Sequence, residues 1–160
     1  MTTLATSAAQ NGKAVTTKKA FSQETSVSIR IHADASTIWA LLTNASDFPR
    51  WNSTITSLEG SIEVGQKIHL KSVLDDKRTF KIKIRLMEAP HRMVWGDSQG
   101  ERVFTLTPNE DGSVTFSMRE KIGGLMFPMY KGYLPPFEEN FEQYARDLKN
   151  EAETIANLKN

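Results

Sequence analysis

The stretch that decides the fold is Ile31-His32-Ala33-Asp34-Ala35-Ser36-Thr37-Ile38-Trp39-Ala40-Leu41-Leu42-Thr43-Asn44, followed closely by Asp47-Phe48-Pro49-Arg50-Trp51-Asn52. Its start completes an alternating strand in which Val27, Ile29 and Ile31 share one face. Asp34 is a typical helix N-cap, and the apolar spacing that follows predicts a helix through Thr43. Ser46 or Asp47 then caps a second, shorter helix. The sequence therefore predicts one strand followed by two short helices.

Strand signals then repeat at hairpin spacing from Lys67 onward. The clearest is 80–86, where Phe80, Ile82, Ile84 and Leu86 alternate with basic residues. Further strands are indicated around 67–72, 93–95, 104–106 and 114–120. Together the pattern predicts about six strands joined by short turns.

The C-terminal segment changes to helical spacing. Its apolar residues recur at steps of three and four, which predicts one amphipathic helix of about twenty residues: Phe137, Phe141, Tyr144, Ala145, Leu148, Ala152 and Ile155. Pro135-Pro136 should break or kink any helix that runs through them, because proline removes a backbone hydrogen bond. Antiparallel hairpins with helices grouped on one side predict an α+β domain.

Length and composition narrow the function classes. At 160 residues the chain is expected to form one domain over 23–158, preceded by a disordered N-terminal tail over 1–22. The absence of cysteine excludes disulfides and thiolate sites. A formal net charge of +1 provides no overall field for nucleic acid. No apolar run is long enough for a transmembrane segment, and we expect a cytoplasmic protein.

Four segments, taken together and in order, resemble the polyketide cyclase/START-like (SRPBCC, Bet v 1-like) superfamily over about residues 24–156. They are Ala35–Trp39, Phe48-Pro49-Arg50-Trp51-Asn52, Pro90-His91-Arg92-Met93-Val94-Trp95, and Glu120–Pro128. The resemblance implies a helix-grip fold, with a curved antiparallel sheet, two short helices after the first strand, and a long C-terminal helix packed across the sheet. It also implies an internal cavity for apolar ligands.

Glu120 is the candidate catalytic acid, because it continues the inward face set by Phe116 and Met118. A carboxyl group facing an apolar cavity should have a raised pKa and can transfer protons. The alternative is a strand-end residue that reaches water or pairs with Arg119 or Lys121. Tyr130 and Tyr133 are candidate hydroxyl donors, and core packing at the start of the helix is the alternative for them.

The expected ligand-binding wall combines inward strand positions with large adaptable side chains near the helix start. Its residues are Trp51, Leu70, Ile82, Ile84, Trp95, Phe104, Phe116, Met118, Met126, Met129, Phe137 and Phe141. We expect these residues to surround a void of roughly 300–1,000 Å³. His32, His69 and His91 are far apart in the sequence, so neither a metal site nor a cofactor is expected.

Three functions remain open from sequence. The first is binding of a small hydrophobic molecule, such as a lipid, a polyketide or an aromatic metabolite. The second is an enzyme of the cyclase/dehydratase type, which two converging polar groups in the cavity would favour. The third is a chaperone-activator-like interaction domain, which an apolar patch outside the cavity would favour. The identity of the ligand and the oligomeric state are not determined by the sequence.

Overall fold

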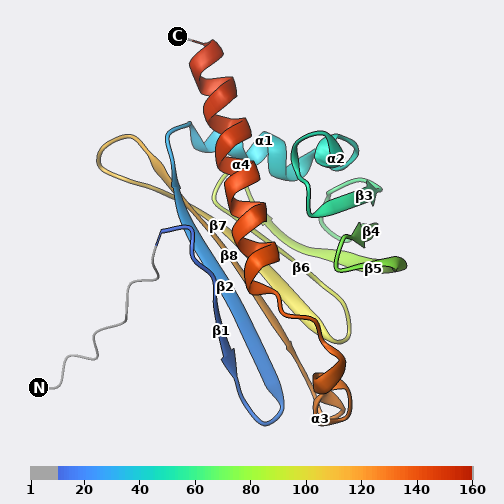
Figure 1. The fold of residues 1–160 in the computed structure, drawn as a ribbon. Coiled ribbons are helices and arrows are strands. Elements are labelled where there is room, and N and C mark those ends of the chain that lie inside the picture. The colour runs from blue at the N-terminus through green and yellow to red at the C-terminus, as the bar shows by residue number, and fades with distance from the viewer. Residues whose placement is uncertain (1–10, 160) are drawn as a thin grey trace, which may run out of the picture.

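A computed structural model describes residues 11–159 of the chain. Eight strands form one antiparallel sheet in the order β1-β2-β8-β7-β6-β5-β4-β3. The sheet is curved, and the long helix α4 lies across its concave face (Figure 1). The strands are β1 (Val15–Lys18), β2 (Ser22–Ile31), β3 (Ile55–Glu59), β4 (Lys67–Ser72), β5 (Asp75–Glu88), β6 (Arg92–Gly96), β7 (Gly100–Pro108) and β8 (Val114–Gly123). The helices are α1 (Ala35–Thr43), α2 (Phe48–Trp51), α3 (Phe127–Tyr130) and α4 (Glu138–Leu158), with the 3-10 turns η1 (Ala45–Asp47) and η2 (Lys131–Tyr133).

This arrangement confirms the predicted α+β helix-grip fold. The helix α1 begins immediately after Asp34, which occupies the N-cap position without a capping hydrogen bond from its side chain. Asp47 holds the same position before α2, and its carboxylate binds Arg50 instead. Six strands follow α2, of which β3 is the one that the sequence pattern did not locate.

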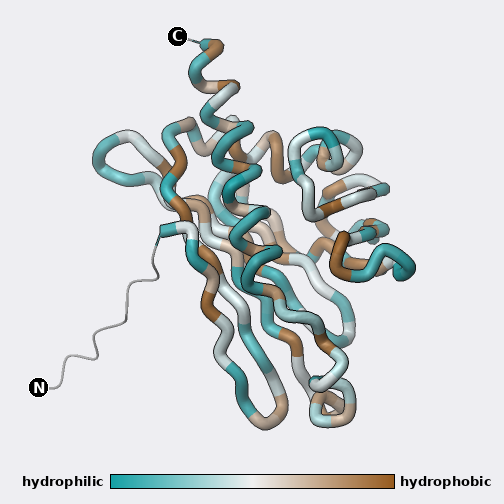
Figure 2. Tube along the Cα trace, in the orientation of Figure 1, coloured by the Kyte–Doolittle hydropathy of each residue, from teal (hydrophilic) through white to brown (hydrophobic). Residues whose placement is uncertain are grey.

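The core lies between the sheet and α4. Val27, Ile29 and Ile31 of β2 are buried, and the residues between them are half-buried or exposed. The helix α4 buries Phe141, Tyr144, Ala145, Leu148 and Ala152, which confirms the predicted apolar stripe. Its outward face is largely hydrophilic (Figure 2). Burial of this stripe is the main stabilising contribution of α4, since packing stabilises protein helices more than propensity does.

The two prolines separate α4 from the preceding short helices, as predicted. The chain leaves β8, forms α3 and η2, and then runs extended from Leu134, where φ is −74° and ψ is 132°. Helix α4 begins only at Glu138. The break leaves residues 134–137 as a non-helical segment at the edge of the core, where it borders the cavity described below.

The expectation of a disordered tail through residue 22 is wrong for its second half. Residues 1–10 lie outside the described part, but Val15–Lys18 form β1, which pairs with β2. Thr16 and Thr25 share a hydroxyl hydrogen bond of 2.8 Å, and the Ala14 amide donates to Oε1 of Glu142 on α4 at 3.0 Å. An edge strand needs few apolar side chains, because hydrogen bonds to the neighbouring strand hold it in place. Composition alone therefore did not reveal β1.

Candidate functional site

A cavity of about 230 Å³ lies between the concave face of the sheet and the segment that leads into α4. Apolar side chains form most of its wall: Ile55, Leu70, Leu74, Phe80, Ile82, Trp95, Ile122, Leu134, Pro135 and Phe137. The polar residues that line it are Ser72, Asp75, Arg78, Asp97, Gln99, Arg102, Glu120, Tyr133 and Asn140. Its volume is below the predicted range, so the site suits a compact molecule better than a long lipid.

The electrostatic centre of the cavity is an ion pair between two adjacent strands. Arg102 on β7 lies directly opposite Glu120 on β8 in the sheet register. Nη2 of Arg102 donates to Oε2 of Glu120 at 2.6 Å, and the two side chains are only 13% and 23% exposed. The guanidinium also lies 5.1 Å from the centre of the Phe141 ring on α4, within cation–π range. The pair therefore brings a positive and a negative group together in a mainly apolar wall.

Arg102 has hydrogen-bonding capacity that the protein does not use. Its Nε is buried and has no hydrogen-bond partner among the described residues. A buried donor without an acceptor is costly, typically by about 1–3 kcal/mol. The side chain of Asn140, which is half-buried at the start of α4, lines the same cavity. The site can therefore offer donors from Arg102 and Asn140 and an acceptor from Glu120 to a polar group that enters it.

The structure brings together six of the residues expected at the site. Leu70, Ile82, Trp95 and Phe137 line the cavity, as do two of the candidate catalytic residues, Glu120 and Tyr133. Glu120 pairs with Arg102 across the sheet, and not with its sequence neighbours Arg119 or Lys121. The inward direction expected for Glu120 is thus observed, but it enters the cavity as one half of an ion pair.

Six other expected wall residues pack into the solid core and do not line the cavity: Trp51, Ile84, Phe104, Phe116, Met118 and Phe141. For Trp51, Phe104 and Phe116, the physical reason is the side chain of Tyr144, which projects from α4 and is 1% exposed. Its ring stacks on Phe116 with a centroid separation of 6.2 Å and lies 6.3 Å from Phe104. Burial raises the pKa of Tyr144 well above its ordinary value, although the positive charge of Arg102 acts to lower that pKa. Tyr144 therefore fills the space that the sequence analysis assigned to a ligand.

The remaining expected residues lie at the tip formed by α3. Met126 and Met129 are 60% and 71% exposed, and neither lines the cavity. Tyr130 is half-buried and packs edge-on against Phe127, with ring centroids 5.6 Å apart. The break before α4 is the reason, because it lets α3 turn away from the cavity at the end of β8 (Figure 1).

Sequence reasoning missed Arg102, Phe80 and Asn140. A usable signal existed for Arg102, which lies two residues before the inward-facing Phe104 and so belongs to the same face of β7. Recognising its partner required the register that places Arg102 beside Glu120. Asn140 carried no signal, since the apolar stripe of α4 does not include it.

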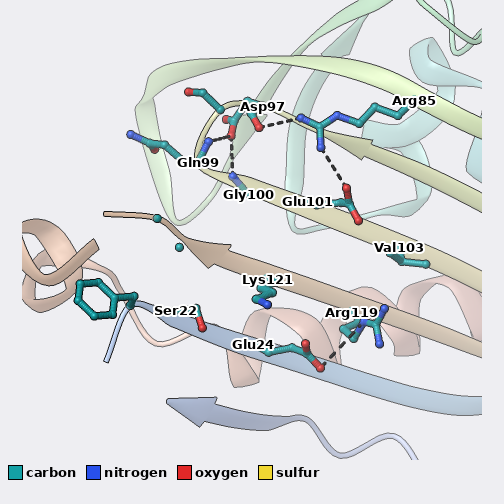
Figure 3. Close-up of a pocket in the computed structure, with 14 residues that line it drawn as sticks. Ser22, Glu24, Arg85, Asp97, Gln99, Gly100, Glu101, Val103, Arg119 and Lys121 are labelled. Atoms are coloured by element: carbon teal, nitrogen blue, oxygen red, sulfur yellow. Dashed lines mark hydrogen bonds and ion pairs between the residues drawn. The ribbon is translucent and has the colours of Figure 1, made fainter. Parts of the chain in front are cut away.

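A second depression, of about 740 Å³, lies on the sheet face that carries the outward side chains of β2, β7 and β8 (Figure 3). Its charged groups largely satisfy one another. Arg85 binds Glu101 at 3.0 Å, and Oδ1 of Asp97 accepts hydrogen bonds from the amides of Gln99 and Gly100. Arg119 lies 4.0 Å from Glu24. This open, polar surface offers little apolar wall, and the smaller, more apolar cavity is the better candidate site.

Over 11–159, no group of three or more His, Cys, Asp or Glu side chains is arranged to hold a metal ion. None of the helices in that range is both long and apolar enough to cross a bilayer.

Comparison with known families identifies the class of protein to which this fold belongs. Residues 22–153 match the family model described as polyketide cyclase/dehydrase and lipid transport. Since the match spans most of the chain, the protein belongs to this family. No curated protein sequence matched the chain.

Solved structures show the same fold at low sequence identity. A START superfamily protein from Mycobacterium smegmatis is 16% identical, with a TM-score of 0.61 over 82% of this chain and 98% of that one. A protein from Rhodobacter sphaeroides is 18% identical, with a TM-score of 0.65 over 89% and 99% of the two chains. A norcoclaurine synthase from Thalictrum flavum, solved with a transition-state analogue, is 14% identical, with a TM-score of 0.64 over 87% and 99%. These similarities establish the fold alone.

Proposed function

We propose that this protein binds a compact, mainly apolar small molecule that carries a neutral polar group, in the cavity between the sheet and the start of α4. The observation that carries the proposal is the Arg102–Glu120 pair within an apolar wall. The two charges of the pair compensate each other, so the pair itself has no net charge to attract an ionic ligand. A carbonyl or hydroxyl can accept a hydrogen bond from Arg102, and a hydroxyl can also donate one to Glu120. Family membership supports the small-molecule function.

Filling the cavity should weaken binding. Ile82 lines the cavity and is only half-buried, so Ile82→Trp should place an indole in the cavity with limited strain. The probe is N-phenyl-1-naphthylamine, a compact neutral dye whose fluorescence rises in apolar surroundings. We expect the wild type to bind the dye with saturation and Ile82→Trp to lose roughly tenfold or more in affinity, which corresponds to the loss of one well-packed apolar contact.

The matched control is Val73→Trp. Val73 is 52% exposed in the β4–β5 turn and does not line the cavity. Its variant should bind the dye like the wild type. Equal affinity in the wild type and Ile82→Trp would show that the dye binds elsewhere and would contradict the proposal. Native mass spectrometry of the purified protein then identifies the molecule that the cavity retains.

An enzyme is the second candidate function, because Glu120 and Tyr133 line the same cavity. The variant Glu120→Gln separates the two. For a binding protein, we expect Glu120→Gln to lower affinity for the retained molecule by about the value of one hydrogen bond, ~0.5–1.5 kcal/mol. For an enzyme, turnover of that molecule should fall by ~10²–10⁴, as is typical for loss of a general acid or base. We expect the first result, because Arg102 already holds the carboxylate of Glu120.

A further inference from the structure

The end of the molecule that carries α3 exposes a group of large apolar side chains. They come from two segments that are far apart in the sequence, the β1–β2 turn and the stretch from β8 to η2. We call them the apolar tip: Phe21, Leu125, Met126, Met129 and Tyr133, which are 56%, 88%, 60%, 71% and 88% exposed. In Figure 1, α3 and the β1–β2 turn lie at the same end of the sheet, opposite the C-terminus of α4.

Backbone contacts hold the two segments of the apolar tip together. The Gly124 amide donates to the carbonyl of Phe21 at 3.0 Å. Gly123 permits this approach, because a Cβ at that position would lie 2.6 Å from the same carbonyl oxygen. Phe127 is 2% exposed and anchors α3, so Met126 and Met129 beside it remain outward. The exposure of these side chains is therefore built into the fold.

The segments that form the apolar tip are basic. Residues 15–23 and 121–137 contain four lysines, Lys18, Lys19, Lys121 and Lys131, and no Asp or Glu. All four lysines are exposed. Of the three acidic residues in the depression beside Phe21, Glu101 binds Arg85, Glu24 lies 4.0 Å from Arg119, and Asp97 is the third. The lysines therefore leave this end with an excess of positive charge.

We infer that the apolar tip docks onto anionic lipid bilayers. A bilayer surface has an apolar acyl region beneath a layer of charged headgroups. The exposed apolar side chains can enter the acyl boundary, and the lysines around them can bind the anionic headgroups. A protein partner would need acidic groups to match the lysines, whereas an anionic bilayer presents them at any orientation. Tyr133, Leu134 and Pro135 follow α3 and line the cavity, so docking would place the cavity wall beside the membrane. The inference concerns a surface, and it does not depend on which molecule the cavity binds.

Cosedimentation of the full chain with vesicles tests this inference. The wild type should bind vesicles of phosphatidylcholine containing roughly one third phosphatidylglycerol, remain in solution with pure phosphatidylcholine, and be released by high salt. Leu125→Ser/Met129→Ser should lower the partition coefficient roughly tenfold or more, because two exposed apolar anchors are lost. Lys19→Glu/Lys131→Glu should bind at the background level. Circular dichroism verifies that each variant is folded.

Two matched controls fix the location of the surface. Leu158→Ser removes an 81% exposed leucine at the opposite end of the molecule, and Lys81→Glu/Lys83→Glu reverses two exposed charges on β5. Both should bind vesicles like the wild type. The inference is overturned if the wild type does not bind anionic vesicles or if the controls lose as much binding as the tip variants. A dimer that depends on Leu125 and Met129, without vesicle binding, would overturn it by assigning the apolar tip to contact between protein chains.

Discussion

Replacing Arg102 with leucine should lower the free energy of unfolding by about 3 kcal/mol, because it leaves the carboxylate of Glu120 largely buried without its partner. Both side chains are mostly removed from water, and the 2.6 Å contact joins adjacent strands in the middle of the sheet order. Breaking one half of such a pair is far more costly than replacing both halves. Arg102→Leu/Glu120→Leu should therefore recover most of the lost stability. Urea unfolding of both variants, monitored by fluorescence, measures the difference.

Arg119→Leu is the control for Arg102→Leu. Arg119 lies on β8 and, like Arg102, pairs with an acidic residue of the adjacent strand, here Glu24 of β2. This pair spans 4.0 Å, and both side chains are well exposed. Its loss should cost less than about 1 kcal/mol, the usual range for a surface pair. Equal losses of stability in the two single variants would mean that the buried Arg102–Glu120 pair contributes no more to stability than an exposed pair does. In that case the pair would not be a buried polar centre of the cavity.

The elements that the sequence predicted depend on interactions between residues close together in the chain, and those that it missed depend on contacts between distant segments. Local periodicity predicted α1, the strand over 80–86 and the stripe of α4, because each depends on residues within a few positions of one another. The helix break was also a local property, since Pro135-Pro136 act on their own backbone. β1 was missed because its sequence, Val-Thr-Thr-Lys, carries no apolar alternation and gains its order from pairing with β2.

The site required information that a single sequence does not contain. Alternation alone places Arg102 on the inward face of β7 and Glu120 on that of β8, but their contact depends on the strand register. The size of the cavity was overestimated for a similar reason. Tyr144 was predicted to lie on the inward stripe, but how deeply its ring enters depends on the curvature of the sheet and the position of α4. These are distances between segments that lie far apart in the sequence, and periodicity within one segment does not encode them.

Tyr144→Ala should be the most damaging of the substitutions considered, with a loss of about 3–5 kcal/mol, the usual cost of truncating a buried aromatic ring. The ring lies within 6.4 Å of four others, those of Phe48, Trp51, Phe104 and Phe116, and its removal would leave a void at the centre of the core. For a chain of this size, the melting temperature should fall by roughly 10 °C or more. Thermal unfolding followed by circular dichroism measures the change.

Tyr144→Phe isolates the hydroxyl group, which is buried without a hydrogen-bond partner among the described residues. The variant keeps the ring, so it should be as stable as the wild type or more stable by about 1 kcal/mol. The difference should grow at alkaline pH. Because burial raises the pKa of Tyr144 in the folded protein, only the unfolded chain ionises it above about pH 10, and the wild type alone loses this part of its stability as pH rises. A Phe variant that is clearly less stable than the wild type at neutral pH would show that the hydroxyl binds a polar partner. The interior beside Arg102 would then be a second polar part of the ligand site, and not only the packed centre of the core.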